Sequence, residues 1–156
     1  MEFLESYLGI FLIILGQCLL VTVLIHYEVL RLTSLLLPRL KIPPRQCILV
    51  VIVATFMAHT IEVWLYAITF FLITDHFGIG SFGGSLEHHF VDYLYFSTAT
   101  YTSLGYGDIY PLGGLRLMAG IETITGLMMI AWSASFAYLA MEKFWGLHGP
   151  RRARRR

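Results

Sequence analysis

The chain has 156 residues, of which 57% are hydrophobic and only 13% are charged, and its formal net charge is +1. Soluble domains carry roughly twice that share of charged residues, so the composition excludes an ordinary soluble domain and favours a membrane protein. A net charge near zero says little about partners, so the distribution of the charges matters more.

Three apolar runs are long enough to cross a bilayer, which takes about 20 residues in a helix. They cover about residues 7–32, 47–74 and 112–145. Prolines between the first two runs stop a continuous helix. His26 and Glu28 lie near the far end of the first run, where we expect their side chains to snorkel to water.

A glycine-rich segment, residues 77–85, follows the second run and is too polar and flexible to be helical. Ser85 is then a good N-cap, and Glu87 is favoured in a first helical turn. The pattern predicts a short helix over about residues 86–102. Such a helix would re-enter the membrane without crossing it, which requires that protein surround it.

The basic residues predict the orientation in the membrane. Ten of the eleven Lys and Arg residues fall within residues 31–45 or 143–156, and only Arg116 lies elsewhere. By the positive-inside rule both stretches are expected to be cytoplasmic. Three spans then place the N-terminus outside, together with the glycine-rich segment and the acidic residues Asp75, Glu87, Asp92 and Asp108.

Residues 100–108, Thr-Tyr-Thr-Ser-Leu-Gly-Tyr-Gly-Asp, stand between the short helix and the third run. This stretch resembles the selectivity filter of potassium channels, T-x-x-T-x-G-[YF]-G followed by Asp. Rings of backbone carbonyls can replace the water of a potassium ion, and glycine adopts the left-handed angles that turn successive carbonyls to one side. Ser103 replaces a threonine, so we expect selectivity to survive with less rigidity at the inner site.

The resemblance implies an all-α membrane protein with three transmembrane helices, a re-entrant pore helix and a selectivity filter in a tetrameric pore. It is similar to small prokaryotic-type channels with one pore loop per chain, plus one extra N-terminal helix. Residues 1–45 would form that helix and a cytoplasmic linker, 46–145 the pore module, and 146–156 a polybasic cytoplasmic tail. Four identical chains would line K⁺ sites with Ser103, Leu104, Gly105, Tyr106 and Gly107.

The family's supporting positions carry over by register. Tyr95 and Phe96 fall in the aromatic cuff around the filter, and Tyr95 is placed to donate a hydrogen bond to Asp108. Thr100 and Thr102 flank the filter as support. On the third run Gly126 is either a hinge or a plain packing glycine, and the cavity wall and cytoplasmic mouth are expected from Leu127, Ile130, Ala134 and Tyr138.

Polar residues inside a span are expensive and usually paired or functional. Glu122 is expected to brace the filter from behind through the hydroxyls of Thr100 or Tyr101 or through pore-helix amides. His59 and Glu62 share one face of the second helix and would pair with each other or with Gln17 or Thr22. A satisfied polar cluster and a proton sensor are both open for that pair.

The expected function is passive, potassium-selective conduction in the cell membrane. A weakly selective cation channel and a non-conducting regulatory subunit are the alternatives, and no arrangement typical of an enzyme is present. No cofactor is expected beyond permeant K⁺. The tail Arg151–Arg156 is expected to contact anionic lipid headgroups or to act as a topology signal, and not to bind nucleic acid.

Overall fold

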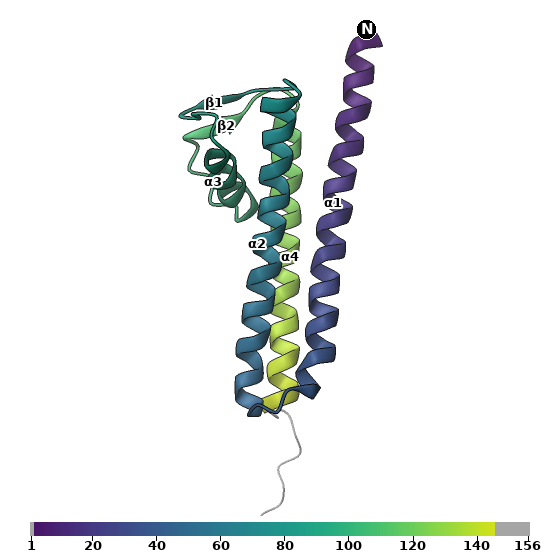
Figure 1. The fold of residues 1–156 in the computed structure, drawn as a ribbon, viewed down its shortest axis with the longest axis vertical. Helices are drawn as coiled ribbons and strands as arrows, with labels where there is room; N and C mark the ends of the chain where they lie inside the picture. The colour runs from purple at the N-terminus through teal and green to yellow at the C-terminus, as the bar shows by residue number, and fades with distance from the viewer. Residues whose placement is uncertain (1, 146–156) are drawn as a thin grey trace, which may run out of the picture.

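The computed structural model describes residues 2–145, with side chains from residue 14 to residue 144. Three long helices run side by side over most of its length (Figure 1). They are α1 (Glu2–Leu36), α2 (Cys47–Phe71) and α4 (Leu115–Trp145). Each contains a stretch long and apolar enough to cross a membrane, which confirms the three predicted spans.

The outer faces of these helices are apolar. Leu20, Phe56 and Ile124 are 55%, 68% and 60% exposed. An amphipathic helix of a soluble protein turns such side chains toward a core, and extended exposed apolar surface indicates contact with lipid or with other protein. The arrangement therefore suits a chain that lies in a bilayer and packs against further chains.

The link between α1 and α2 contains the prolines that were expected to break the helix. Short 3₁₀ turns, η1 (Leu37–Arg39) and η2 (Pro44–Gln46), occupy it, and Pro43 is extended at ψ 140°. Leu37, Cys47 and Val51 form a small buried cluster with Ala140 of α4. This cluster fastens the link to the end of α4.

The short helix α3 (Phe90–Tyr101) has 12 residues. At 1.5 Å per residue it is about 18 Å long, well short of the roughly 30 Å hydrocarbon core. The predicted start at Ser85 and Leu86 is wrong. His89 is the N-cap, and the Asp92 carboxylate accepts hydrogen bonds from the backbone N–H of Glu87 and His89. Because these bonds fix the chain just before the first helical turn, the helix begins at Phe90.

A two-stranded antiparallel sheet, not expected from the sequence, joins the glycine-rich segment to the chain after α3. Strand β1 (Phe82–Gly84) pairs with β2 (Ile109–Pro111), and Gly84 lies opposite Ile109. Gly84 has φ +95°, and a Cβ there would lie 2.9 Å from the Asp108 carbonyl carbon. Only glycine allows this approach.

Edge-to-face aromatic contacts hold α3 against α2. The Phe96 ring lies 5.2 Å from the ring of Phe70 and 4.9 Å from that of Phe82, and Tyr93 contacts Phe71 and Phe82. Such pairs stabilise a core beyond the area that they bury. Helix α3 is therefore fixed to α2 of its own chain.

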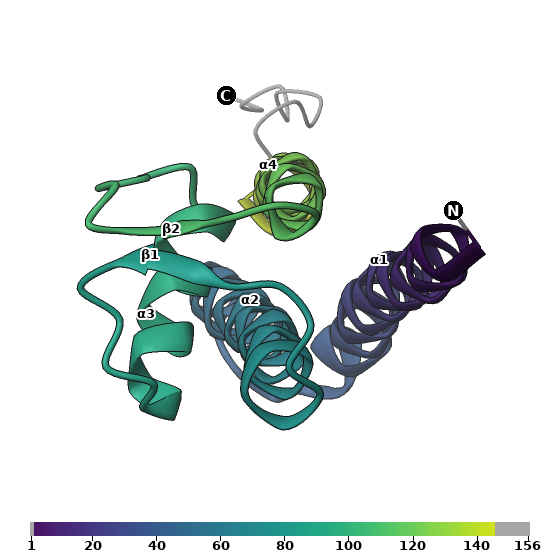
Figure 2. The same cartoon turned by 90° about the horizontal axis from the view of Figure 1, so that it is seen from above.

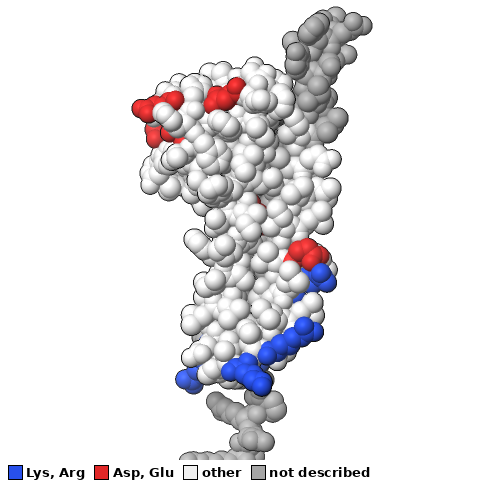
Figure 3. Space-filling model, in the orientation of Figure 1, with Lys and Arg blue, Asp and Glu red and all other residues white. Residues whose placement is uncertain are grey.

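Seen along the long helices, α1 lies beside α2 on the side away from α3 and the strands (Figure 2). On the visible face the acidic residues gather mainly at the end that carries α3 and the sheet, and the basic residues gather toward the other end (Figure 3). The charges are thus separated along the long axis, as the predicted orientation requires.

Candidate functional site

The backbone of residues 103–107 alternates in hand. Ser103, Gly105 and Gly107 have φ of +61°, +55° and +81°, whereas Leu104 and Tyr106 keep negative φ. This alternation turns successive carbonyls to the same side of the segment, which is the arrangement that a carbonyl-lined ion path needs. The predicted left-handed glycines are both present, and Ser103 continues their pattern by one residue.

Ser103 is one of two non-glycine residues with positive φ in the described part of the chain. A β-branched residue at positive φ is a marked outlier, so threonine would carry more strain here than serine does. The replacement of the motif's threonine by serine predicted a loss of rigidity at this position. The backbone angle adds an opposing effect, because serine reaches the required conformation more easily.

The inner end of the filter segment is tied to the C-terminus of α3. The Ala99 carbonyl accepts hydrogen bonds from the backbone N–H of Leu104 at 2.8 Å and of Gly105 at 3.1 Å, and Thr100 O accepts one from Ser103 N at 3.0 Å. The Thr102 hydroxyl donates to the carbonyl of Thr98. The C-terminus of α3 therefore positions the first residues of segment 103–107 directly.

The outer end is held by Asp108. Its carbonyl accepts a hydrogen bond from Ser85 N at 2.9 Å, and its carboxylate accepts the predicted bond from Tyr95 Oη at 3.0 Å. Partial burial raises the pKa of the Tyr95 phenol, and the bond to Asp108 raises it further. The Tyr95 ring is also parallel to the ring of Tyr106, with centroids 6.3 Å apart.

A cavity of about 200 Å³ lies behind the filter segment, lined by residues that include Tyr95, Phe96, Thr100 and Ala119. Phe96 was expected in a cuff around the filter. Its ring packs on aromatic residues of α2 and of β1 and lines this cavity together with Gly105 and Tyr106, so its place in the cuff stays a prediction. Tyr95 alone of the two makes ring contact with a filter side chain.

Glu122 is fully buried, but its predicted partners were wrong. Ser97 Oγ, one turn before Tyr101 on α3, donates to Glu122 Oε1 in a short hydrogen bond, while Oε2 has no partner among the described residues. Thr123, the next residue, instead donates from its hydroxyl to Thr100 O at 3.1 Å. Both bonds join α4 to α3, so Glu122 contacts α3 and not residues 103–107.

Gly126 packs closely against the end of α3. A Cβ at this position would lie 2.9 Å from the carbonyl carbon of Tyr101, whereas one at Gly120 would meet nothing within 4 Å. The expected cavity and mouth residues Leu127, Ile130 and Tyr138 are exposed on the single chain, as is Ala134. Their pore-lining role stays a prediction, and the tail Arg151–Arg156 lies outside the described residues.

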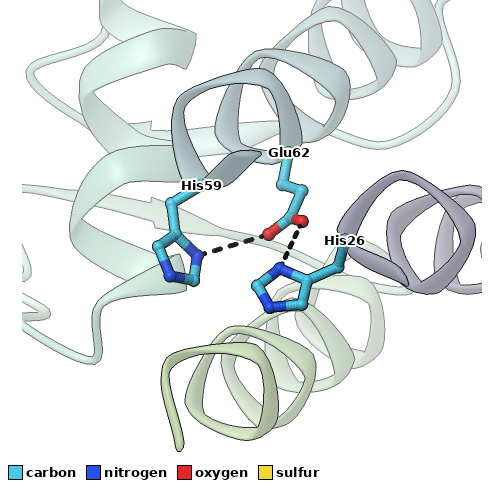
Figure 4. A group of neighbouring side chains, drawn as sticks. All are labelled: His26, His59 and Glu62. Atoms are coloured by element: carbon cyan, nitrogen blue, oxygen red, sulfur yellow. Dashed lines mark hydrogen bonds and ion pairs between the residues drawn. The ribbon is translucent and has the colours of Figure 1, made fainter. Parts of the chain in front are cut away.

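His59 and Glu62 belong to a buried cluster that includes a residue of α1 (Figure 4). His26 Nδ1 lies 2.9 Å from Glu62 Oε1, so neither Gln17 nor Thr22 is the partner. His26 does not snorkel; its side chain is fully buried. The buried position of His26 could have been inferred from the sequence, because Cys18, Thr22 and His26 recur every four residues and so share one helix face.

Two further side chains close the cluster. Tyr101 Oη donates to Glu62 Oε2 in a short hydrogen bond and lies 2.9 Å from His59 Nδ1. Ser133 Oγ of α4 lies 3.2 Å from His26 Nε2 and 3.0 Å from His59 Nε2. The ligand atoms of the two histidines and Glu62 lie within 4.8 Å of one another, yet each already has a protein partner, so hydrogen bonding accounts for the cluster without an ion.

Comparison with known proteins gives a match to a family model described as ion channel, over residues 47–143. The matched region begins at the first residue of α2 and ends two residues before the end of α4. No curated protein and no solved structure matches the chain significantly.

Proposed function

The chain belongs to the ion channel family, and on that premise we propose that it forms a potassium-selective channel that conducts passively through a homotetrameric pore. The observation that carries the proposal is the alternating backbone of residues 103–107, with positive φ at Ser103, Gly105 and Gly107. An ordinary turn places one or two residues at positive φ. Three alternate residues present a row of carbonyls, which is the chemistry that replaces the water of a potassium ion.

The shape of the single chain supports the proposed assembly. One filter segment supplies one side of a carbonyl ring, and the side chains of Leu104 and Tyr106 are 56% and 67% exposed. Four copies around an axis would close the ring and cover these side chains. Cyclic assemblies of identical chains are the ordinary solution to such a requirement.

The proposed membrane is the cell membrane, with the filter end outside. Asp75, Glu87 and Asp108 surround that end, and an acidic mouth attracts cations by raising their local concentration. Arg39, Lys41 and Arg45 lie in the link at the opposite end, where cytoplasmic loops carry excess positive charge.

The test is ion flux from the purified protein in liposomes, with potassium and sodium gradients compared. We expect potassium flux well above sodium flux, blocked by barium. Comparable fluxes would favour the weakly selective alternative, which Ser103→Thr would then examine. No flux under any pH or lipid condition would favour a regulatory subunit.

A matched pair of glycine variants separates the filter from general backbone strain. Gly105 and Gly113 have nearly equal φ, +55° and +56°, and a Cβ at either would meet nothing within 4 Å. We expect Gly105→Ala to abolish selective flux, because the strained residue disturbs the carbonyl row. Gly113→Ala, outside the filter, should keep it. Equal effects of the two variants would contradict the filter assignment.

A further inference from the structure

The buried cluster around Glu62 is a closed ring of hydrogen bonds. Its five links are Glu62–His26, His26–Ser133, Ser133–His59, His59–Tyr101 and Tyr101–Glu62. The members come from all four helices: His26 from α1, His59 and Glu62 from α2, Tyr101 from α3 and Ser133 from α4. Each link needs one hydrogen between its two heavy atoms.

The number of hydrogens that the ring's side chains supply depends on their protonation state. With Glu62 ionised and both histidines neutral, Tyr101, Ser133 and the two imidazoles supply one hydrogen each, which is four for five links. One link would then join two acceptors. A single added proton completes the ring, either on the Glu62 carboxyl or on an imidazole beside its carboxylate, and in both forms the ring has no net charge.

We propose that this ring is a proton-held latch by which α1 positions the filter, and the proposal rests on the channel function proposed above. With the proton the ring is closed and Tyr101 is held. Without it the buried Glu62 charge lacks a counter-charge and one link is lost, both of which are costly away from water. The latch therefore closes toward acidic pH and loosens as pH rises and the added proton is lost.

Tyr101 is the member that reaches the filter. It is the last residue of α3, its backbone contacts Gly126 of α4, and the carbonyls just before it, of Ala99 and Thr100, accept the hydrogen bonds that start the filter. A movement of the Tyr101 side chain thus acts on the groups that hold Leu104 and Gly105. His26 is a positioning residue in this scheme, because it acts through Tyr101.

The other titratable groups near the ring include Tyr66 of α2, which is fully buried and interacts with Tyr101. On α1, Glu28 is turned to the surface and pairs with Arg31. On α4, Trp132 packs on the His26 ring, and Glu122 is engaged by Ser97. His59 is 21% exposed and, with Tyr101, lines a cavity of about 380 Å³ between α2, α3 and α4.

Glu62→Gln isolates the proton. The glutamine amide donates to Tyr101 and accepts from His26, so all five links are filled without a titratable carboxyl. We expect wild-type potassium flux in liposomes to fall as pH rises. The ratio of protonated rings, in which the latch is closed, to deprotonated rings should change up to tenfold per pH unit in each chain. Flux through Glu62→Gln should stay at the acidic wild-type level, and Glu28→Gln, the same change on the helix surface, should behave as wild type.

Thermal unfolding against pH gives a second measurement that does not depend on conduction. While the ring is closed, the folded chain holds one proton that the unfolded chain releases once its histidines are neutral. Wild-type stability should therefore fall as pH rises through the opening of the ring. Glu62→Gln should flatten that slope. If no variant or wild type conducts but this difference is present, the latch stands and the channel function fails.

Tyr101→Phe tests the coupling itself. Loss of the Tyr101 hydroxyl leaves the direct contact between His59 Nδ1 and Glu62 Oε2, which are 3.4 Å apart, so the remaining side chains still take up a proton. We expect stability to keep its pH slope while flux loses it. Wild-type pH slopes of both flux and stability in Glu62→Gln would overturn the proposal, as would a wild-type flux slope in Tyr101→Phe.

Discussion

The contact of Gly126 with Tyr101 predicts that Gly126→Ala destabilises the protein while Gly120→Ala stabilises it. Both glycines lie in α4. At Gly126 the new Cβ would meet the Tyr101 carbonyl carbon at 2.9 Å and its Cγ at 3.0 Å. Carbon atoms in contact are ordinarily about 3.5–4.0 Å apart, so α3 and α4 must separate by at least about 0.6 Å.

The magnitude follows from two opposing effects. Overpacking costs about 1–3 kcal/mol, and the upper end applies because a backbone group is less able to move than a side chain. Alanine gains about 1 kcal/mol over glycine in a helix. Gly126→Ala should therefore lose about 2 kcal/mol net, and Gly120→Ala, which meets nothing within 4 Å, should gain about 1 kcal/mol.

Thermal unfolding of the purified protein in detergent measures both variants. For a chain of this size about 1 kcal/mol shifts Tm by about 2–4 °C, so the two variants should differ by about 6–12 °C. The shift at Gly126 should be accompanied by loss of potassium over sodium selectivity, because the filter starts at the displaced end of α3. Equal Tm values, with altered flux only for Gly126→Ala, would refute the packing explanation and favour the hinge.

Four other changes probe the support of the filter. Tyr95→Phe removes the bond to Asp108, worth about 1 kcal/mol, and should lower the potassium-to-sodium flux ratio in liposomes about fivefold without changing Tm by more than a few degrees. Gly84→Ala places a Cβ on the Asp108 carbonyl at positive φ and should cost about 2 kcal/mol or more, seen as a lowered Tm and loss of flux. Ser97→Ala removes the hydroxyl that pairs with buried Glu122 and should lower stability by about 1–3 kcal/mol, whereas Glu122→Gln keeps that link and should cost less. Unchanged melting in Gly84→Ala or Ser97→Ala, or an unchanged flux ratio in Tyr95→Phe, would show that the contact in question contributes little.

The features that could be predicted from the sequence depend on local chemistry. Chain length and hydropathy determine whether a run can cross a bilayer, and the three predicted spans are present. Glycine tolerates positive φ at low cost, so the alternation at Gly105 and Gly107 could be expected from residue type. The bond from Tyr95 to Asp108 was also expected, because the family's register places these residues close together.

The features that could not be predicted depend on how the helices are rotated against each other. The first helix was expected to end near residue 32, which put His26 close to water. In the structure Arg31 pairs with Glu28 at 2.7 Å and α1 continues to Leu36, so His26 lies inside the bundle. Ser97 and Thr100 lie on the same face of α3, one helical turn apart. Glu122 is level with the turn that contains Ser97, a difference that spacing along α4 does not reveal.

The β1–β2 pair was missed for a related reason. Each strand has three residues, and they are separated by the whole pore helix and filter, so neither shows the alternation by which longer strands are recognised. Gly84 was interpreted only as part of a flexible segment. Its requirement comes from the approach of Asp108, a contact distant in sequence.

Successive carbonyl dipoles in residues 103–107 share one direction, because the sign of φ alternates along the segment. In an ordinary strand these dipoles alternate and largely cancel. Here one edge offers acceptors without donors, so no other strand can pair with it, and the aligned oxygens repel each other until a cation lies among them. In the proposed channel the permeant ion is therefore also a structural ligand. A ligand that binds only the assembled state stabilises it by mass action, so the assembly should be least stable when potassium is withdrawn.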